Sequence, residues 1–193
     1  MMTEPVPNRA PNAEIVFESF FGNTRRVAEA IADGMQAHLP AVLVDVRQAK
    51  PAVDHRVLVV GAPTHAHSLS RPSSRREAEI WARDLGKHLV LEHGSKETGI
   101  REWAETGPVA TLGYAAFDTR VDMPRIFTGS AAAAITKRLQ RAGRRELVRP
   151  ESFLVDKDSH LLPGELERAH DWGVTIAVAA LSTHVAASGR QRP

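Results

Sequence analysis

The residues best suited to chemistry lie near the start of the chain, in a turn between a short apolar run and an amphipathic stretch. The apolar run 15–17 (Ile-Val-Phe) has the β-branched and aromatic residues of a buried strand. Val27, Ile31 and Met35 then recur at every fourth position and predict one apolar face of a helix. A helix N-terminus presents unpaired backbone N–H groups and a partial positive charge. The turn 19–24 is therefore predicted to bind a phosphate group.

The residue types within this turn agree with that chemistry. Gly22 allows the backbone to approach a ligand closely, and Ser19, Asn23 and Thr24 add short polar side chains. The alternative is an ordinary strand-to-helix turn with an Asn or Thr cap. The loops further along the chain are needed to choose between the two.

Composition limits the class of protein. The chain has 193 residues, 42% of them hydrophobic and 25% charged, which predicts one globular domain with a full core. A formal net charge of +2, with a sequence pI of about 9.3, is far from the signature of a nucleic-acid-binding protein. No segment has the length and apolarity of a membrane span, or the apolar core of a signal peptide. The proline-punctuated residues 1–12 and the end 186–193 are predicted to be disordered tails around a domain at 13–185.

Cysteine is absent from the chain. Its absence excludes disulfides, thiolate metal sites, iron–sulfur clusters and cysteine nucleophiles. It is consistent with a reducing cytoplasm, which is the location we expect.

Apolar runs and helical patterns alternate along the rest of the chain. Further strands are predicted at 41–46, 56–61, 109–117 and 146–155, and helices at 74–85, 99–105, 130–139 and 164–184. The helix at 74–85 is predicted to begin with a capping box of Ser74 and Glu77. Five strands alternating with helices predict an α/β protein in which an open parallel sheet is covered on both faces.

Ligands of such sheets bind outside the carboxyl ends of the strands. Three predicted loops lie there, at 19–24, 62–71 and 117–122, which is enough for one mononucleotide. A dinucleotide fingerprint, a P-loop lysine and a Gly-x-Ser-x-Gly nucleophile elbow are all absent.

Several other residues have both a functional and a structural interpretation. His65 and His67 have no Cys, Asp or Glu at ligand spacing, which argues against a metal site and in favour of hydrogen bonding; His67 is also a hypothetical proton donor. A basic run of Arg71, Arg75 and Arg76 is interpreted as a solvated helix start, or else as a site that attracts a nicotinamide phosphate or an anionic partner. The three tryptophans, Trp81, Trp103 and Trp172, are predicted to pack helices on the sheet, and 156–160 is predicted to be a surface turn.

Several segments resemble known proteins. The sequence from Ser19 to Thr24 resembles the phosphate loop of flavodoxin-like proteins, and Gly61 to His65 resembles the Gly-x-Pro-Thr turn of the flavodoxin-like quinone reductases. Later stretches (117–120, 128–132, 165–169 and 172–173) are similar to a group of actinobacterial flavodoxin-domain proteins. The resemblance spans about 14–181. It implies a three-layer, doubly wound, flavodoxin-like fold with strand order 2-1-3-4-5.

The resemblance also implies one non-covalently bound FMN. The phosphate would be held by Ser19, Gly22, Asn23 and Thr24 with the backbone of Phe20 and Phe21. The isoalloxazine would lie between Pro63, Thr64 and His65 on one side and Phe117, Asp118, Thr119 and Arg120 on the other. Two features depart from the flavodoxin pattern. Phe21 stands where many flavodoxins have threonine, and the third loop lacks a stacking tyrosine because Tyr114 falls inside a predicted strand.

The expected function is electron transfer through this flavin, with a redox partner protein and without nucleic acid or membrane. An NAD(P)H-dependent FMN reductase acting on a small quinone or related acceptor is the first alternative. A flavin-free sensor or interaction module on the same fold is the second, because of the missing tyrosine.

Overall fold

The computed structural model describes residues 13–50, 56–65, 67–83, 89–92, 98–106 and 112–189, with the backbone alone at 186–189. The strands are β1 (Ala13–Phe17), β2 (Ala41–Asp45), β3 (Val57–Pro63), β4 (Gly113–Val121) and β5 (Glu151–Val155). The helices are α1 (Asn23–Met35), α2 (Pro72–Arg83), α3 (Ile100–Glu105), α4 (Arg125–Thr128), α5 (Ala131–Arg141) and α6 (Glu165–Gly189).

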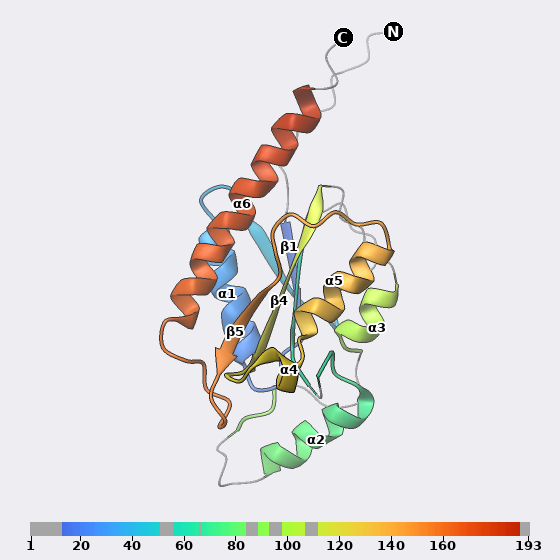
Figure 1. Cartoon of the computed structure of the whole chain (residues 1–193), viewed down its shortest axis with the longest axis vertical. Helices are drawn as coiled ribbons and strands as arrows, with labels where there is room; N and C mark the ends of the chain where they lie inside the picture. Colours follow the sequence, from blue (N-terminus) through green and yellow to red (C-terminus); the bar gives the residue numbers. More distant parts are fainter. Residues whose placement is uncertain are drawn as a thin grey trace.

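The five strands form one parallel sheet in the order β2-β1-β3-β4-β5, as predicted. Helices α1 and α6 cover one face, and α3 and α5 cover the other (Figure 1). β3 occupies the centre, and its residues from Val57 to Ala62 are buried, in agreement with its continuous apolar sequence. The fold is therefore a doubly wound α/β sheet of the predicted class.

Successive side chains of each strand point to opposite faces of the sheet, so the core has two parts, one on each face. Ile15 and Phe17 of β1 pack under α1 and α6, whereas Val16 packs towards α3 and α5. Glycines bring α1 and α6 close together: a Cβ built on Gly34 would lie 2.0 Å from the carbonyl oxygen of His170. This contact fixes α1, and therefore the turn that precedes it, against the sheet.

The largest difference from the sequence prediction concerns β4. The strand ends at Val121 rather than at 117, so the predicted loop 117–122 is almost entirely strand. Its polar residues can lie within the sheet because neighbouring groups hydrogen-bond to them: Asp118 accepts from Thr64 and Ser130, and Thr119 is hydrogen-bonded to Thr24. Residues 107–111 lie outside the described residues, and they include the first three positions, 109–111, of the predicted strand.

Helix α2 begins two residues earlier than predicted. Proline favours the first position of a helix, and the Ser74 hydroxyl bonds to the backbone of Arg71 inside the first turn rather than forming the predicted capping box. Strand β5 begins at Glu151, after Pro150, rather than at 146.

Helix α6 continues past 185 to Gly189, whereas the predicted tail at 1–12 and the last residues, 190–193, lie outside the described residues. None of the helices in the described part of the chain combines the length and apolar character needed to cross a lipid bilayer.

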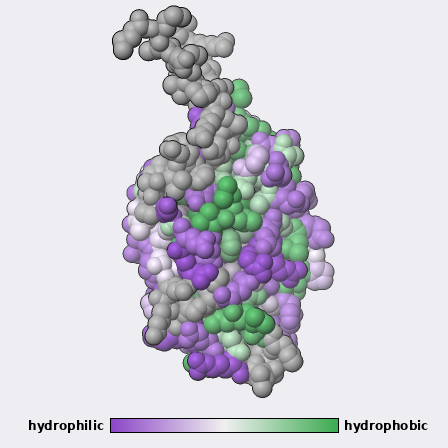
Figure 2. Space-filling view, turned by 180° about the vertical axis from the view of Figure 1, so that it is seen from behind, coloured by the Kyte–Doolittle hydropathy of each residue, from purple (hydrophilic) through white to green (hydrophobic). Residues whose placement is uncertain are grey.

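The surface is mixed in character. On the face seen in Figure 2, apolar residues form several separate groups among hydrophilic ones. At the edge strand β2, Val42 is 56% exposed. At the carboxyl end of the sheet, Ile126 and Phe127 of α4 are also exposed.

Candidate functional site

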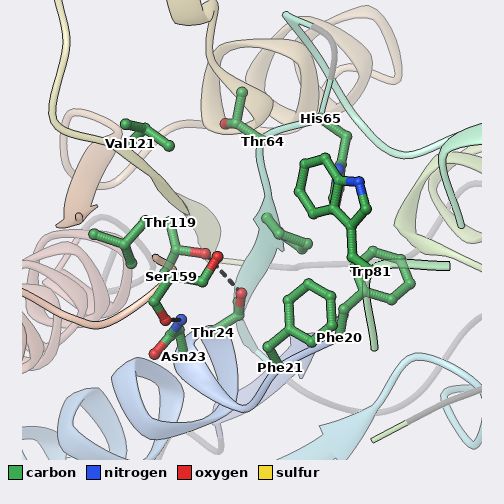
Figure 3. A pocket seen from close by; sticks show the side chains of 12 residues that line it. Phe20, Phe21, Asn23, Thr24, Thr64, His65, Trp81, Thr119, Val121 and Ser159 are labelled. Carbon is green, nitrogen blue, oxygen red and sulfur yellow. Dashed lines mark hydrogen bonds between the residues drawn. The ribbon is translucent and has the colours of Figure 1, made fainter. Parts of the chain in front are cut away.

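A pocket of about 200 Å³ lies at the carboxyl ends of β1, β3 and β4, where parallel α/β sheets bind ligands. Residues from six segments of the chain line it (Figure 3). They are Phe20, Phe21, Asn23, Thr24, Pro63, Thr64, His65, Trp81, Thr119, Val121, Val155 and Ser159. The structure thus brings together predicted residues from all three segments of the expected site.

The N-terminus of α1 opens beside this pocket. Gly22 is its N-cap with a φ of +83°, no side chain caps the helix, and its first turn contains no acidic residue. The amide of Arg26 donates to the Gly22 carbonyl oxygen at 2.9 Å, and the preceding amides are those that an α-helix leaves without an intrahelical partner. Ser19, 1% exposed, places a buried hydroxyl without a hydrogen-bond partner in the same turn. These are the properties of an anion site.

The N-terminus of α5, at the same edge of the sheet, is closed. Its first three amides donate to Thr64 Oγ1 (2.9 Å), Asp118 Oδ2 (2.9 Å) and Ser130 Oγ (3.1 Å). Asp118 also accepts from the hydroxyls of Thr64 and Ser130, at 3.1 and 2.6 Å. Asp118 is therefore a buried cap for α5, and not the lining residue that the resemblance implied.

Two polar side chains predicted to hold a phosphate are engaged with the protein instead. The Asn23 amide donates to the carbonyl oxygen of Ser159 at 2.5 Å, and the hydroxyls of Thr24 and Thr119 are 2.8 Å apart (Figure 3). They join α1 to β4 and to the turn at 156–160. That turn, predicted to be a simple surface turn, therefore contributes Ser159 to the rim of the pocket.

One wall of the pocket is aromatic. Phe20, Phe21, His65 and Trp81 gather on one side, opposite Thr119, Val121 and Ser159 (Figure 3). The rings of Phe20 and His65 meet edge to face, with centroids 5.0 Å apart.

The prediction that Trp81 packs a helix on the sheet was wrong. Trp81 is 45% exposed on α2 and lines the pocket, whereas Trp103 and Trp172 pack in the two cores. Nothing in the local sequence around Trp81 distinguishes a residue that faces the sheet from one that faces a pocket.

His65 and His67 have different environments. Burial without a charged partner lowers the pKa of His65 to about 4, so its imidazole is neutral at pH 7. His67 is exposed, has a φ of +71° and bridges to Gly129, away from the lining. No cluster of three or more side chains suited to a metal ion is found among the described residues.

Of the four residues expected from the third segment, only Thr119 lines the pocket. Strand alternation explains this: Phe117, Thr119 and Val121 share the face towards α1 and α6, whereas Asp118 faces α5. Phe117 is fully buried in that core. Arg120 instead donates to the carbonyl oxygen of Met123 at 2.6 Å.

The basic run after the second loop is only partly solvated. Arg71 and Arg76 are exposed, but Arg75 is 5% exposed, pairs with Glu102 at 3.1 Å and donates to Ser70. The Ser70 hydroxyl in turn donates to the carboxyl of Glu18, whose pKa burial raises. The prediction of a solvated helix start was therefore wrong for Arg75, which anchors α2 to α3 and β1.

The fold is similar to that of several solved structures, although no match is found in sequence. No protein-family model matches the sequence, and no curated protein matches it in sequence. A flavodoxin from the domain Archaea superposes with a TM-score of 0.59 at 17% identity, over 88% of this chain and 99% of that one. A WrbA-like flavodoxin from Agrobacterium tumefaciens has a TM-score of 0.55 at 16% identity, over 90% and 99%.

A third similar structure is the Flv1 flavodiiron core from Synechocystis sp. PCC6803. Its TM-score is 0.60 at 15% identity, over 91% of this chain. This chain spans only 37% of that protein. The shared strand order and the superpositions lead to one conclusion: this chain has a flavodoxin-like fold.

Proposed function

We propose that this protein binds FMN at the carboxyl edge of its sheet and takes part in electron transfer. The observation that carries the proposal is the contrast between two helix ends at that edge: α1 has no side-chain cap, whereas the first three amides of α5 already have side-chain acceptors. The names of the similar structures, flavodoxins and flavodoxin-like proteins, support the choice of ligand.

The residues of the pocket fit the two ends of such a ligand. The amides from Gly22 to Thr24 and the Ser19 hydroxyl would hold the phosphate. The flat ring would lie between the aromatic wall, which includes Trp81, and the opposite wall with Val121 and Val155. Bound flavin supplies the redox chemistry, and the protein supplies binding, orientation and electrostatics.

The size of the pocket bears on the type of reaction. At about 200 Å³ it is smaller than the roughly 300–1,000 Å³ of typical enclosed ligand sites. One edge of the ring would therefore remain in water, where a second molecule can approach it. This arrangement suits electron transfer to a partner that docks at the surface.

A visible absorption spectrum tests the proposal. The purified protein is recorded before and after FMN is added and the excess is removed, and we expect a retained, perturbed flavin spectrum. Gly22→Ala should lose this flavin, because a side chain at φ +83° strains the turn and its Cβ would lie 3.1 Å from a Glu92 carboxylate oxygen.

Gly164→Ala is the matched control for that variant. Gly164 has the same φ of +83°, but a Cβ there would meet nothing within 4 Å, so flavin should be retained. Loss of flavin in both variants, or in neither, would contradict the proposed phosphate site.

An FMN reductase that uses NAD(P)H is a second candidate. It is favoured by the exposed guanidinium groups of Arg71 and Arg76 at the start of α2, the helix that also carries Trp81. Turnover of a small quinone with NAD(P)H and no other protein would support it. A carrier would require a separate reductase.

A flavin-free interaction module is the third candidate. It is favoured by the engagement of Asn23 and Thr24 with protein groups, which removes two side-chain donors from the phosphate site. A protein that stays colourless after FMN addition would support this alternative.

A further inference from the structure

Glu92 brings a carboxylate to the open end of α1. Its backbone amide donates to the carbonyl oxygen of Phe20 at 2.8 Å, which places residues 89–92 against the phosphate turn. A Cβ built on Gly22 would lie 3.1 Å from Glu92 Oε1. The side chain of Glu92 is 19% exposed, and its Oε2 is buried without a hydrogen-bond partner.

Two carboxylates pair with Arg25, in the first turn of α1. Arg25 donates to Glu92 Oε1 from Nε (2.8 Å) and Nη2 (2.7 Å). Its third nitrogen, Nη1, bonds to Glu29 at 2.8 Å on the helix surface. The guanidinium therefore has two carboxylates for its single positive charge. Arg25, Glu29 and Glu92 together therefore carry no net positive charge that could attract a phosphate to this end of α1.

We propose that Glu92 is a specificity-determining residue of the phosphate site: its carboxylate opposes a phosphate dianion at the N-terminus of α1. The inference rests on the proposed flavin binding and adds that Glu92 influences which flavin is bound. Like charges at short range repel strongly at a partly buried site. FMN and riboflavin have the same ring, but only FMN carries the phosphate. The carboxylate of Glu92 therefore reduces the preference of the site for FMN over riboflavin, compared with a helix N-terminus that has no carboxylate beside it.

The test compares dissociation constants for FMN and riboflavin, measured by quenching of flavin fluorescence. Glu92→Gln keeps the shape of the side chain and the backbone bond to Phe20 but removes the charge. We expect FMN to bind about tenfold more tightly to this variant, and riboflavin to bind within about twofold of wild type. Thermal melting of each variant checks that the fold is retained, and Glu92→Ala replaces Glu92→Gln if that variant does not fold.

Glu29→Gln is the matched control. Glu29 shares Arg25 with Glu92 but lies one turn into α1, on its surface, so the ratio of FMN to riboflavin affinity should change much less than it does in Glu92→Gln. An unchanged ratio in Glu92→Gln, or a ratio that moves equally in both variants, would overturn the inference.

Two further outcomes separate this inference from the proposed function. If Glu92→Gln binds FMN more weakly while riboflavin is unaffected, Glu92 orients Arg25 towards the phosphate, and the inference is overturned while flavin binding stands. If neither flavin binds to wild type or to Glu92→Gln, the proposed function itself is wrong and the inference falls with it.

Discussion

At the scale of single residues, Ser19 shows how the site is prepared for a ligand. Its hydroxyl is buried in the turn before α1 and has no partner in the described structure. A buried polar group without a hydrogen bond costs about 1–3 kcal/mol. A ligand oxygen at this point would remove that cost.

Replacing Ser19 by Ala should therefore affect stability and binding in opposite directions. We expect the free energy of unfolding of the free protein to be unchanged or raised by about 1 kcal/mol, because an unsatisfied group is removed. FMN should bind about tenfold more weakly, and riboflavin equally well, in a fluorescence titration. Destabilisation of the free protein by Ser19→Ala would contradict this account of the hydroxyl.

His65 gives a prediction on pH. Its pKa in the folded protein is lowered to about 4, below its ordinary value of 6.5, so the unfolded chain takes up the proton first. Stability contributed by the neutral ring is present above pH 6.5 and is lost as the pH falls towards 4, by up to about 3 kcal/mol. Glu18, whose pKa is raised, acts in the opposite sense in its own range.

The comparison of wild type with His65→Gln isolates this contribution. We expect the difference in unfolding free energy between the two proteins to shift against wild type between pH 6.5 and 4. The measurement is urea unfolding at a series of pH values, together with NMR titration of the imidazole. An imidazole that titrates near pH 6.5 in the folded protein would contradict the prediction.

At the scale of elements, the beginnings of α1 and α5 set the chemistry of the edge. Asp118 accepts hydrogen bonds from one amide of α5 and from two hydroxyls. It therefore stabilises the N-terminus of α5 from a neighbouring strand, as an acidic residue in the first turn does in other helices. Because Asp118 is buried inside β4, it contributes to stability and does not line the pocket.

Replacing Asp118 by Ala should therefore destabilise the protein by roughly 2–4 kcal/mol, because several buried donors lose their acceptor. This corresponds to a fall in Tm of about 5–15 °C for a chain of this size. Asp118→Asn, which keeps one acceptor oxygen, should recover part of the loss. Asp122→Ala, at an exposed position just beyond the same strand, is the control and should leave Tm unchanged.

The same elements show how far the sequence could predict the structure. β1, β3 and the turn before α1 were predicted because their apolar runs and glycine depend on local chemistry alone. The end of β4 was missed because Asp118 and Thr119 look like loop residues until their partners, distant in the sequence, are known. Trp81 was missed for a related reason: whether an aromatic residue of a helix faces a core or a pocket depends on how that helix docks.

At the scale of the whole molecule, the strand order brings the turn at 19–24, the end of β3 and the end of β4 to one edge, although they are distant in sequence. The crossover from β3 to β4 adds Trp81 and Glu92 to that edge. The fold was therefore predictable from the alternation of elements. The aromatic wall and the carboxylate beside α1 could not be predicted, because they depend on the path of this crossover.

The response of individual backbone amides to FMN, recorded by NMR on the ¹⁵N-labelled protein, tests the proposed phosphate site most directly. We expect the largest shifts at Gly22, Asn23 and Thr24, and small shifts at the start of α5, whose amides already have acceptors. Shifts centred on α5, or no amide shifts at the α1 turn at saturating FMN, would contradict it.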